Sequence, residues 1–564
     1  MNTPARLPAP MGLLIDRNQP LTFSFDGRTY QGLQGDSIAS ALLANGRFLL
    51  SRSFKYHRPR GPLTMAGQDA NSLIQLPHEP NVLADTFALH EGLQATGQNF
   101  NGSLDNDKDA YLGKFSKFMP VGFYYRSFYK PKGMWKVWEP IIRKKAGLGV
   151  LDLNFQPEYY DKAYLFTDLA VIGAGPAGLQ AALTAANAGA KVLLIEQQPI
   201  LGGSLTYARF DIDGQRAEQL RRELVAAVEA HDNIQVLKQA TCNAWFTDNY
   251  LPVIQGKRMY KVRATQCLVC SGSLDQPVIF RNNDLPGVML TSAVQRLMKL
   301  YAVKPGKRAV VLTGNDDGYL AALDLHDQGV EVVAVADMRT NPSDRELQLA
   351  LEQRGIACHM STTVYEALHE KGMRHVSGAE LRKITGQGQV ANHGLSVECD
   401  LLCMSGGYMP VYQLLCQAGA SLPMTINRPN SPSAACRRTW ALQARSMAIT
   451  YWITCWQMLQ MPLTTLFPHS VWKRLVTTLH CTVKQRSISA GRSSRTPRAR
   501  ISSISMKTCK CATSSTPRVS ATATSSWSNA IPRSAWARRK AATRRCRPRA
   551  WSRRQPSAAS AKPA

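Results

Sequence analysis

The sequence predicts an α/β protein with a small β-grasp unit at its N-terminus and a Rossmann-like dinucleotide-binding domain after it. Three observations carry this prediction. A hairpin and a helix are indicated at 21–46, a strand, glycine turn, helix and strand at 168–197, and a similar series at 308–337. At 564 residues the chain is long enough for two to four domains with sizeable cores.

The hairpin signal lies in "LTFSFDGRTYQG", where apolar and polar residues alternate over 21–25 and Asp26-Gly27 follows. Asp-Gly supplies the positive φ angles of a type I′ turn. In "GDSIASALLANG" we expect a helix with Asp36 or Ser37 as N-cap, ending at Gly46. The next residues, "RFLL" at 47–50, read as a strand.

These elements predict a β-grasp domain over residues 1–95. The basic run "RSFKYHRPRG" at 52–61 has two open interpretations, a solvated loop and a charged interface surface. Residues 96–165 read as an irregular, aromatic connector. Its bunched Tyr, Trp and Phe favour packing against a neighbouring domain or subunit, with stacking on nucleobases as the alternative.

The best-defined segment is "DLAVIGAGPAGLQAALTAANAGAKVLLIEQ" at 168–197. A buried strand at 169–172 leads into three spaced glycines, then a helix, then a second strand at 192–195. Gly173 permits the tight turn, Gly175 lets a pyrophosphate approach the backbone, and Gly178 allows close packing of helix on strand. Glu196 lies where a carboxylate accepts hydrogen bonds from ribose hydroxyls. We therefore predict a dinucleotide site here, a vestigial Rossmann unit being the alternative.

A second unit is indicated by "RAVVLTGNDDGYLAALDLHDQGVEVVAVAD" at 308–337. Its strand at 309–312 leads into a turn with Gly314 and Gly318, and its last strand ends at Asp337. Because this turn lacks the spaced triplet, it is either a second nucleotide site or a layer kept for packing. Two such units in one domain, predicted over 166–425, indicate a two-dinucleotide flavoprotein architecture.

The 13 cysteines begin only at Cys242. Their odd number and the absence of a secretory leader favour reduced thiols in a cytoplasmic protein. Cys267 and Cys270 form a Cys-x-x-Cys pair, which can be a redox centre, but we expect a strand here that separates the two thiols. With no second such pair, no metal site is predicted. No nucleophile, base or metal constellation appears, so no catalytic residue is assigned.

Basic charge is confined to the end of the chain. The net charge is +29, with 68 Lys and Arg against 39 Asp and Glu. No acidic residue follows Asp400, whereas 26 of the basic residues do, so the first 400 residues carry 42 basic and 39 acidic groups, a net of +3. The main body is therefore nearly neutral, and its charge does not indicate a nucleic-acid or membrane partner.

Several segments in this order resemble the α subunit of heterotetrameric sarcosine oxidase, over roughly residues 10–423. They are "SRSFKYHRPRG", "MPVGFYYRSFYKP", "WEPIIRKKAGLG", "VIGAGPAGLQAAL", "EQQPILGGSL", "NNDLPGVML" and "LLCMSGGYMPV". The resemblance implies a subunit that acts with β, γ and δ type partners. In that family sarcosine is oxidised at a flavin on the β subunit, and a C-terminal folate domain captures the one-carbon unit as methylene-tetrahydrofolate.

The resemblance also implies that NAD is bound, with FAD as the alternative because related enzymes place FAD in this type of fold. "LGGS" at 201–204 is expected to approach the same nucleotide. The cofactor-binding residues are predicted to be Gly173, Ala174, Gly175, Pro176, Ala177, Gly178, Glu196, Gln197, Gly202, Gly203 and Ser204.

In the family the N-terminal unit resembles a two-iron ferredoxin domain. The corresponding loop here, "LTMAGQDANSLI" at 63–74, has no thiolate, and a cluster needs four. We therefore predict a cluster-free ferredoxin-like unit.

Residues 426–564 form a basic tail in which no family segment is recognised. At the acid frequency of the first 400 residues about 16 acids are expected over 401–564, and none occurs. A frameshift explains this best. Asp and Glu codons both begin with GA, so one change of reading frame removes every intended acidic residue at once. The folate domain is then missing. A disordered basic arm that binds nucleic acid and a membrane anchor at 447–467 are the alternatives. We expect neither a membrane nor a nucleic-acid partner. A frameshifted product is expected to be destabilised.

Two other functions remain open. One is a stand-alone reductase of the pyridine-nucleotide disulfide type that uses FAD and Cys267 with Cys270. The other is a non-enzymatic nucleotide-binding module with a nucleic-acid arm.

Overall fold

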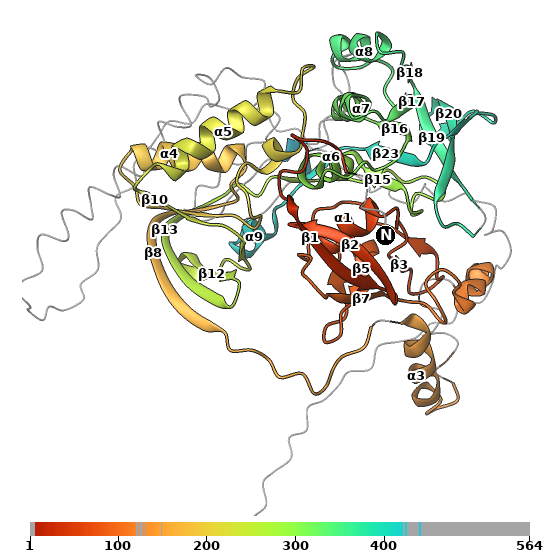
Figure 1. Ribbon diagram of the computed structural model, residues 1–564, viewed down its shortest axis with the longest axis horizontal. Coiled ribbons are helices and arrows are strands. Elements are labelled where there is room, and N and C mark those ends of the chain that lie inside the picture. The colour runs from red at the N-terminus through yellow and green to blue at the C-terminus, as the bar shows by residue number, and fades with distance from the viewer. Residues whose placement is uncertain are drawn as a thin grey trace, which may run out of the picture. The chain divides into compact units, whose positions relative to one another are not determined.

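A computed structural model describes residues 6–119, 122, 128, 130–147, 149–370 and 372–420, with the backbone of 424–425 and 439–440 (Figure 1). The predicted basic tail therefore lies outside the described residues, apart from the short backbone segment at 439–440. The fold is mixed α/β, with a ferredoxin-type unit followed by two sheets of Rossmann type, as the sequence predicts.

The N-terminal unit is a five-stranded sheet in the order β2-β1-β7-β5-β6. Its strands are β1 (Asp16–Phe25), β2 (Arg28–Gln34), β5 (Leu73–Gln75), β6 (Val82–Leu83) and β7 (Gln94–Gly97). The predicted hairpin turn is confirmed, since Asp26 and Gly27 have φ angles of 50° and 75°. Helix α1 (Ile38–Ala44) begins after Ser37, whose side chain accepts a hydrogen bond from the backbone of Ser40.

The expected strand at 47–50 is wrong. This segment has no regular structure, and the short strand β3 (Ser51–Arg52) pairs instead with β4 (Pro59–Arg60). Leu49 and Leu50 are fully buried, so their apolar character reflects a place in the core and not a place in a ladder. The 3-10 helix η1 (Ala70–Ser72) follows before β5.

The connector contains more regular structure than expected. It holds the 3-10 helix η2 (Lys108–Phe118) and helix α3 (Trp135–Ala146), which ends at Gly147 with a left-handed φ of 59°. No residue of α3 is buried in the chain. The connector's predicted ends at 96 and 165 remain predictions, although strand β8 (Asp161–Ile172) already begins inside that range.

The first Rossmann-type sheet has six strands in the order β10-β9-β8-β13-β12-β11. Its remaining strands are β9 (Val192–Ile195), β10 (Ile234–Leu237), β11 (Ala240–Cys242), β12 (Tyr250–Gln255) and β13 (Arg258–Val269). Helices α4 (Pro176–Asn187) and α5 (Arg216–Glu229) cover one face, and the short turns η3 (Gly203–Thr206) and η4 (Thr247–Asn249) lie in the connections (Figure 1). Alternate residues of β8 enter two different core clusters, one on each face.

The second sheet is parallel, in the order β15-β23-β16-β17-β18. Its strands are β15 (Val288–Leu290), β16 (Arg308–Thr313), β17 (Glu331–Asp337), β18 (Ala357–His359) and β23 (Leu401–Ser405). Its helices are α6 (Thr291–Tyr301), α7 (Asp317–Asp327) and α8 (Arg345–Glu352). The predicted strand–turn–helix–strand series at 308–337 is present as β16, α7 and β17.

The smaller elements complete the described chain. An antiparallel sheet contains β19 (Thr362–His369), β20 (Val376–Gly386), β21 (Gln389–Val390) and β22 (Leu395–Glu398). Strand β14 (Ser273–Asp275) pairs with β24 (Tyr408–Pro410), and helix α9 (Gln413–Gln417) follows. The last described pair is β25 (Met424–Thr425) with β26 (Thr439–Trp440). No helix among the described residues is both long enough and apolar enough to cross a membrane.

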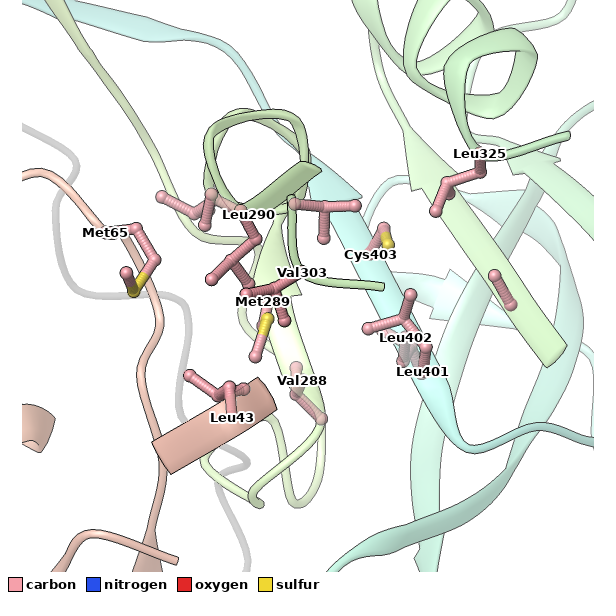
Figure 2. Packing of buried hydrophobic residues seen from close by; sticks show 14 of the residues in the cluster. Leu43, Met65, Val288, Met289, Leu290, Val303, Leu325, Leu401, Leu402 and Cys403 are labelled. Atoms are coloured by element: carbon pink, nitrogen blue, oxygen red, sulfur yellow. The ribbon is translucent and has the colours of Figure 1, made fainter. Parts of the chain in front are cut away.

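One apolar cluster joins the N-terminal unit to the second sheet. Figure 2 shows Leu43 of α1 and Met65 close to Val288–Leu290 of β15, all of them members of this cluster. At its edge Arg58 and Arg60 both donate hydrogen bonds to the carboxylate of Asp284. The basic run at 52–61 is therefore, at these two arginines, an interface within the chain.

Candidate functional site

Close backbone contacts hold the glycine turn between β8 and α4. Gly173 has a φ of +100°, and a Cβ there would lie 2.5 Å from the carbonyl oxygen of Cys270. A Cβ on Gly178 would lie 1.8 Å from the carbonyl oxygen of Gly173, so only glycine fits. Gly175 is different, because its Cβ would meet nothing closer than 4.0 Å. Two glycines thus shape the turn, whereas the third leaves its outer side open.

The open side of the turn is the N-terminus of α4. Gly175 is the N-cap and Pro176 occupies the first turn, and no side chain caps the helix. First-turn N–H groups have no acceptor within the helix, and the helix dipole places partial positive charge at this end. This end of α4 is suited to bind a phosphate.

Glu196 braces the turn from the end of β9. One carboxylate oxygen accepts the N–H of Ala174 at 2.7 Å, and the other accepts the N–H of Gln198 at 2.8 Å. Burial raises the pKa of the Glu196 carboxyl group above its usual value. Each carboxylate oxygen keeps a second lone pair, so Glu196 can brace the turn and still accept a hydroxyl.

The "LGGS" segment packs directly on the turn. The N–H of Gly202 donates to the carbonyl oxygen of Ala174 at 2.9 Å. A Cβ on Gly203 would lie 2.7 Å from the Cα of Gly175, so the two backbones touch.

A cavity of about 1790 Å³ opens in front of these elements. Eight of the eleven predicted cofactor residues line it: Gly173, Gly175, Pro176, Ala177, Glu196, Gln197, Gly203 and Ser204. The other three, Ala174, Gly178 and Gly202, are not among the lining residues and support the turn through the contacts above. The structure thus brings the predicted residues together, while their binding role remains a prediction.

Much of the remaining cavity wall comes from residues that the sequence does not indicate as cofactor ligands. They include Asp275 of β14, Tyr408 of β24, Arg296 of α6, and Asn315 and Asp317 at the turn before α7. Residues 64–66 of the N-terminal unit also line the cavity. A sequence signal exists for some of them, since "SGSLDQP" and "SGGYMP" are glycine-containing turns after strands.

The turn of the second Rossmann unit is acidic. Asp316 and Asp317 lie at the start of α7, where a bound phosphate would need positive charge. Asp337, at the end of β17, already accepts hydrogen bonds from Tyr319 and Arg339. Of the two open interpretations, these contacts favour a layer kept for packing.

The two cysteines of the Cys-x-x-Cys pair lie on different faces of the first sheet. Cys267 is buried in one core cluster, and Cys270 packs against the other. Burial raises the pKa of the Cys267 thiol to about 12. A thiol of that kind is a poor nucleophile at neutral pH.

Two buried carboxylates hold the loop at 63–74. Asp69 accepts backbone N–H groups from Leu63, Thr64 and Asn71. Asp85 accepts the N–H groups of Ala66 and Gly67 at 3.1 and 2.9 Å. Burial is the main reason that the pKa of the Asp85 carboxyl group rises to about 6.

Comparisons with known proteins agree with this architecture. A family model described as a 2Fe-2S iron-sulfur cluster binding domain matches residues 18–100. A second, described as pyridine nucleotide-disulphide oxidoreductase, matches residues 167–428. The residues of the first region do not fit a cluster, because it contains no cysteine and carboxylates take up the loop N–H groups. No group of potential metal ligands occurs elsewhere among the described residues.

The curated relatives are longer than this chain. The α subunit of sarcosine oxidase from Rhizobium meliloti (strain 1021) is 38% identical over 432 residues, which are 72% of this chain and 41% of that protein. The corresponding subunit from Corynebacterium sp. (strain P-1) is 33% identical, over 75% and 41% of the two chains. Among solved structures, L-proline dehydrogenase from P. horikoshii is 20% identical with a TM-score of 0.48, covering 73% of this chain and 65% of that one.

The match to sarcosine oxidase α subunits covers most of the described residues, and the two family models cover the two kinds of unit that the fold contains. The chain is thus a homologue of sarcosine oxidase α subunits that combines a ferredoxin-type domain with an oxidoreductase domain of the pyridine nucleotide type.

Proposed function

We propose that this chain is the dinucleotide-binding α-type subunit of a sarcosine oxidase complex, with NAD at the Gly173 turn and FAD as the alternative. One observation carries the proposal. The uncapped N-terminus of α4, the carboxylate of Glu196 and the "LGGS" backbone all border a single cavity large enough for a dinucleotide.

The residues have separate roles in this proposal. The N–H groups at the start of α4 bind the pyrophosphate, and Glu196 accepts a ribose hydroxyl. Gly203 and Ser204 cover the pyrophosphate from the other side of the turn. Gly173, Gly178 and Gly202 keep the backbones close enough for this arrangement.

The proposed reaction of the complete complex is oxidative demethylation of sarcosine, a CH–NH donor. Sarcosine, oxygen and water give glycine, formaldehyde and hydrogen peroxide; with tetrahydrofolate present, methylene-tetrahydrofolate replaces formaldehyde. The catalytic flavin is assigned to a partner subunit, and no catalytic residue is assigned to this chain. The proposed partners are β, γ and δ type subunits in the cytoplasm. Because the chain spans about two fifths of its relatives, a folate-binding role is not proposed for its described residues.

The stand-alone disulfide reductase is less well supported. Such an enzyme needs two thiols that can meet, whereas Cys267 and Cys270 pack into different clusters on the two faces of one sheet. The nucleic-acid arm belongs to residues 426–564, which lie outside the described residues apart from 439–440.

The test has two stages. First, NAD+ and FAD are titrated calorimetrically into the purified full-length chain. We expect one NAD+ to bind per chain, and FAD not to compete with it. Second, the chain is combined with β, γ and δ type subunits, and sarcosine-dependent hydrogen peroxide is measured. Failure to bind either dinucleotide refutes the site, and a complex without sarcosine-dependent peroxide refutes the reaction.

A further inference from the structure

The cavity wall contains two buried polar atoms that have no hydrogen-bond partner among the described residues. They are Oδ1 of Asp275 and Nδ2 of Asn315. One is an acceptor and the other a donor, and both residues line the cavity. An unpaired buried polar group destabilises the folded chain, so each atom is a candidate for contact with a bound molecule.

The surrounding contacts fix the chemistry of the Asn315 side chain. Its Oδ1 accepts the N–H of Asp317 at 3.1 Å and the hydroxyl of Ser405 at 2.9 Å. Because a backbone N–H can only donate, this oxygen assignment is set by the network. Nδ2 is therefore the donor that remains for a ligand.

Negative charge gathers around Asp275. Asp275 and Tyr408 are opposite each other in the β14–β24 ladder, and the Tyr408 hydroxyl donates to Asp317 at the start of α7. Burial first and the nearby Asp317 second raise the pKa of the Asp275 carboxyl group to about 7, against the smaller opposing effects of Ser292 and Arg296.

The two nearby arginines are already engaged. Arg296 donates to the carbonyl oxygen of Thr64 and to the hydroxyl of Tyr207, and it lies 4.1 Å from the Tyr207 ring centroid. Arg339 pairs with Asp337 and Asp316. Among the residues that the structure describes, the acid pair Asp275–Asp317 therefore has no dedicated cation, and its surroundings favour a positively charged ligand group.

The acid pair lies within reach of a dinucleotide at the glycine turn. The turn packs on the Cys270–Ser271 peptide at Gly173. Asp275 follows Ser271 by four residues, a span of at most about 14 Å. One nucleoside of the dinucleotide would lie beside Glu196, which accepts its ribose hydroxyl. The second nucleoside would therefore extend from the pyrophosphate in the opposite direction, along the same cavity.

We propose that Asp275, Asp317 and Asn315 form a nicotinamide subsite that selects oxidised NAD+ over both NADH and FAD. This inference rests on the proposed dinucleotide site. The primary carboxamide of nicotinamide offers one acceptor for Asn315 Nδ2 and one donor for Asp275 Oδ1. The pyridinium ring of NAD+ carries the positive charge that the acid pair favours. NADH lacks that charge, and the flavin ring of FAD lacks both the charge and the primary carboxamide.

The decisive experiment compares ligands that share the ADP-ribose half and differ at the nicotinamide end. NAD+, NADH, deamido-NAD+ and ADP-ribose are titrated into the full-length wild type, Asp275→Asn and, as a matched control, Asp232→Asn, which removes an exposed carboxylate. In the wild type we expect NAD+ to bind about tenfold more tightly than NADH or ADP-ribose, and deamido-NAD+ to bind more weakly than NAD+. Asp275→Asn should weaken NAD+ about tenfold and leave ADP-ribose unchanged.

The pH dependence gives an independent readout. NAD+ affinity should rise between pH 6 and pH 8 as Asp275 ionises, whereas ADP-ribose affinity should stay flat, and Asp275→Asn should abolish the rise. Asp317 and Tyr408 from α7 and β24, and Arg296 with Ser292 from α6, are the groups that face Asp275. Thermal melting checks that each variant is folded.

The outcomes separate the two proposals. If ADP-ribose and the complete dinucleotides all fail to bind, the dinucleotide site itself is refuted, and this subsite with it. If ADP-ribose binds as tightly as NAD+, or if Asp275→Asn weakens every ligand equally, the subsite is refuted and the dinucleotide site stands.

Discussion

Two glycines in the same turn should respond differently to one added methyl group. In Gly178→Ala the new Cβ would lie 1.8 Å from the carbonyl oxygen of Gly173. Both atoms belong to the backbone or are fixed to it, so the turn or the helix must shift. Overpacking of this kind costs about 1–3 kcal/mol. At about 2–4 °C per kcal/mol for a domain of 150–250 residues, we expect Tm to fall by about 2–12 °C.

Gly175→Ala should leave the fold intact and weaken ligand binding. Its Cβ meets nothing within 4.0 Å, and its φ of −70° suits any residue. The gain from a stiffer unfolded chain and the loss of glycine at an N-cap offset each other to within about 1 kcal/mol. The methyl group would instead project into the space proposed for the pyrophosphate, and NAD+ affinity should fall at least about tenfold.

The assay is the same for both variants: a thermal melt without ligand, then a calorimetric titration with NAD+ and ADP-ribose. Gly178→Ala should lower both Tm and affinity, whereas Gly175→Ala should lower affinity alone. A Gly178→Ala chain that melts like the wild type would refute the packing argument. A Gly175→Ala chain that binds normally would show that the pyrophosphate does not approach this turn.

Three further predictions concern other parts of the molecule. The raised pKa of Asp85 means that the folded state binds a proton more tightly than the unfolded state. As pH rises from 4 to 6.5, the free energy of unfolding of the wild type should therefore fall by up to about 3 kcal/mol relative to that of Asp85→Asn. Urea titrations measure this difference, and equal pH profiles for the two proteins would contradict it. Asp284→Asn should lower Tm by several degrees, because it leaves two half-buried arginines without their charge partner, while Asp232→Asn should not. Mass mapping of alkylated native protein at pH 8 should find Cys416 labelled and Cys267 unlabelled, and rapid labelling of Cys267 would revive the redox interpretation.

The local elements were predictable where one short stretch of sequence contains the whole physical reason. The Asp26-Gly27 turn, the Ser37 cap and the strand–glycine turn–helix series at 169–195 are of this kind, and all are present. The strand expected at 47–50 failed because burial and strand pairing give the same apolar signal. Only the partner strand distinguishes them, and it lies at Pro59–Arg60, beyond a loop.

The candidate site was predictable on one side only. The glycine turn and Glu196 form a local pattern with known spacing, so the sequence indicates them directly. The polar groups on the other side of the cavity belong to Asp275, Asn315 and Tyr408, which the fold brings together from three separate segments. Within the described part of the chain, Asp275 lacks a cationic partner because Arg296 and Arg339 bind other groups. The spacing of residues in the sequence does not predict these contacts.

The carboxylates of Asp69 and Asp85 have a consequence for how this chain folds in the cell. In a domain whose loop is held by metal–thiolate bonds, the chain must wait for iron and sulfide before it can fold. Here the same loop closes with groups that the polypeptide itself supplies. The N-terminal domain should therefore reach its folded state under iron starvation and in air, and the supply of folded chain should follow translation rather than the iron status of the cell.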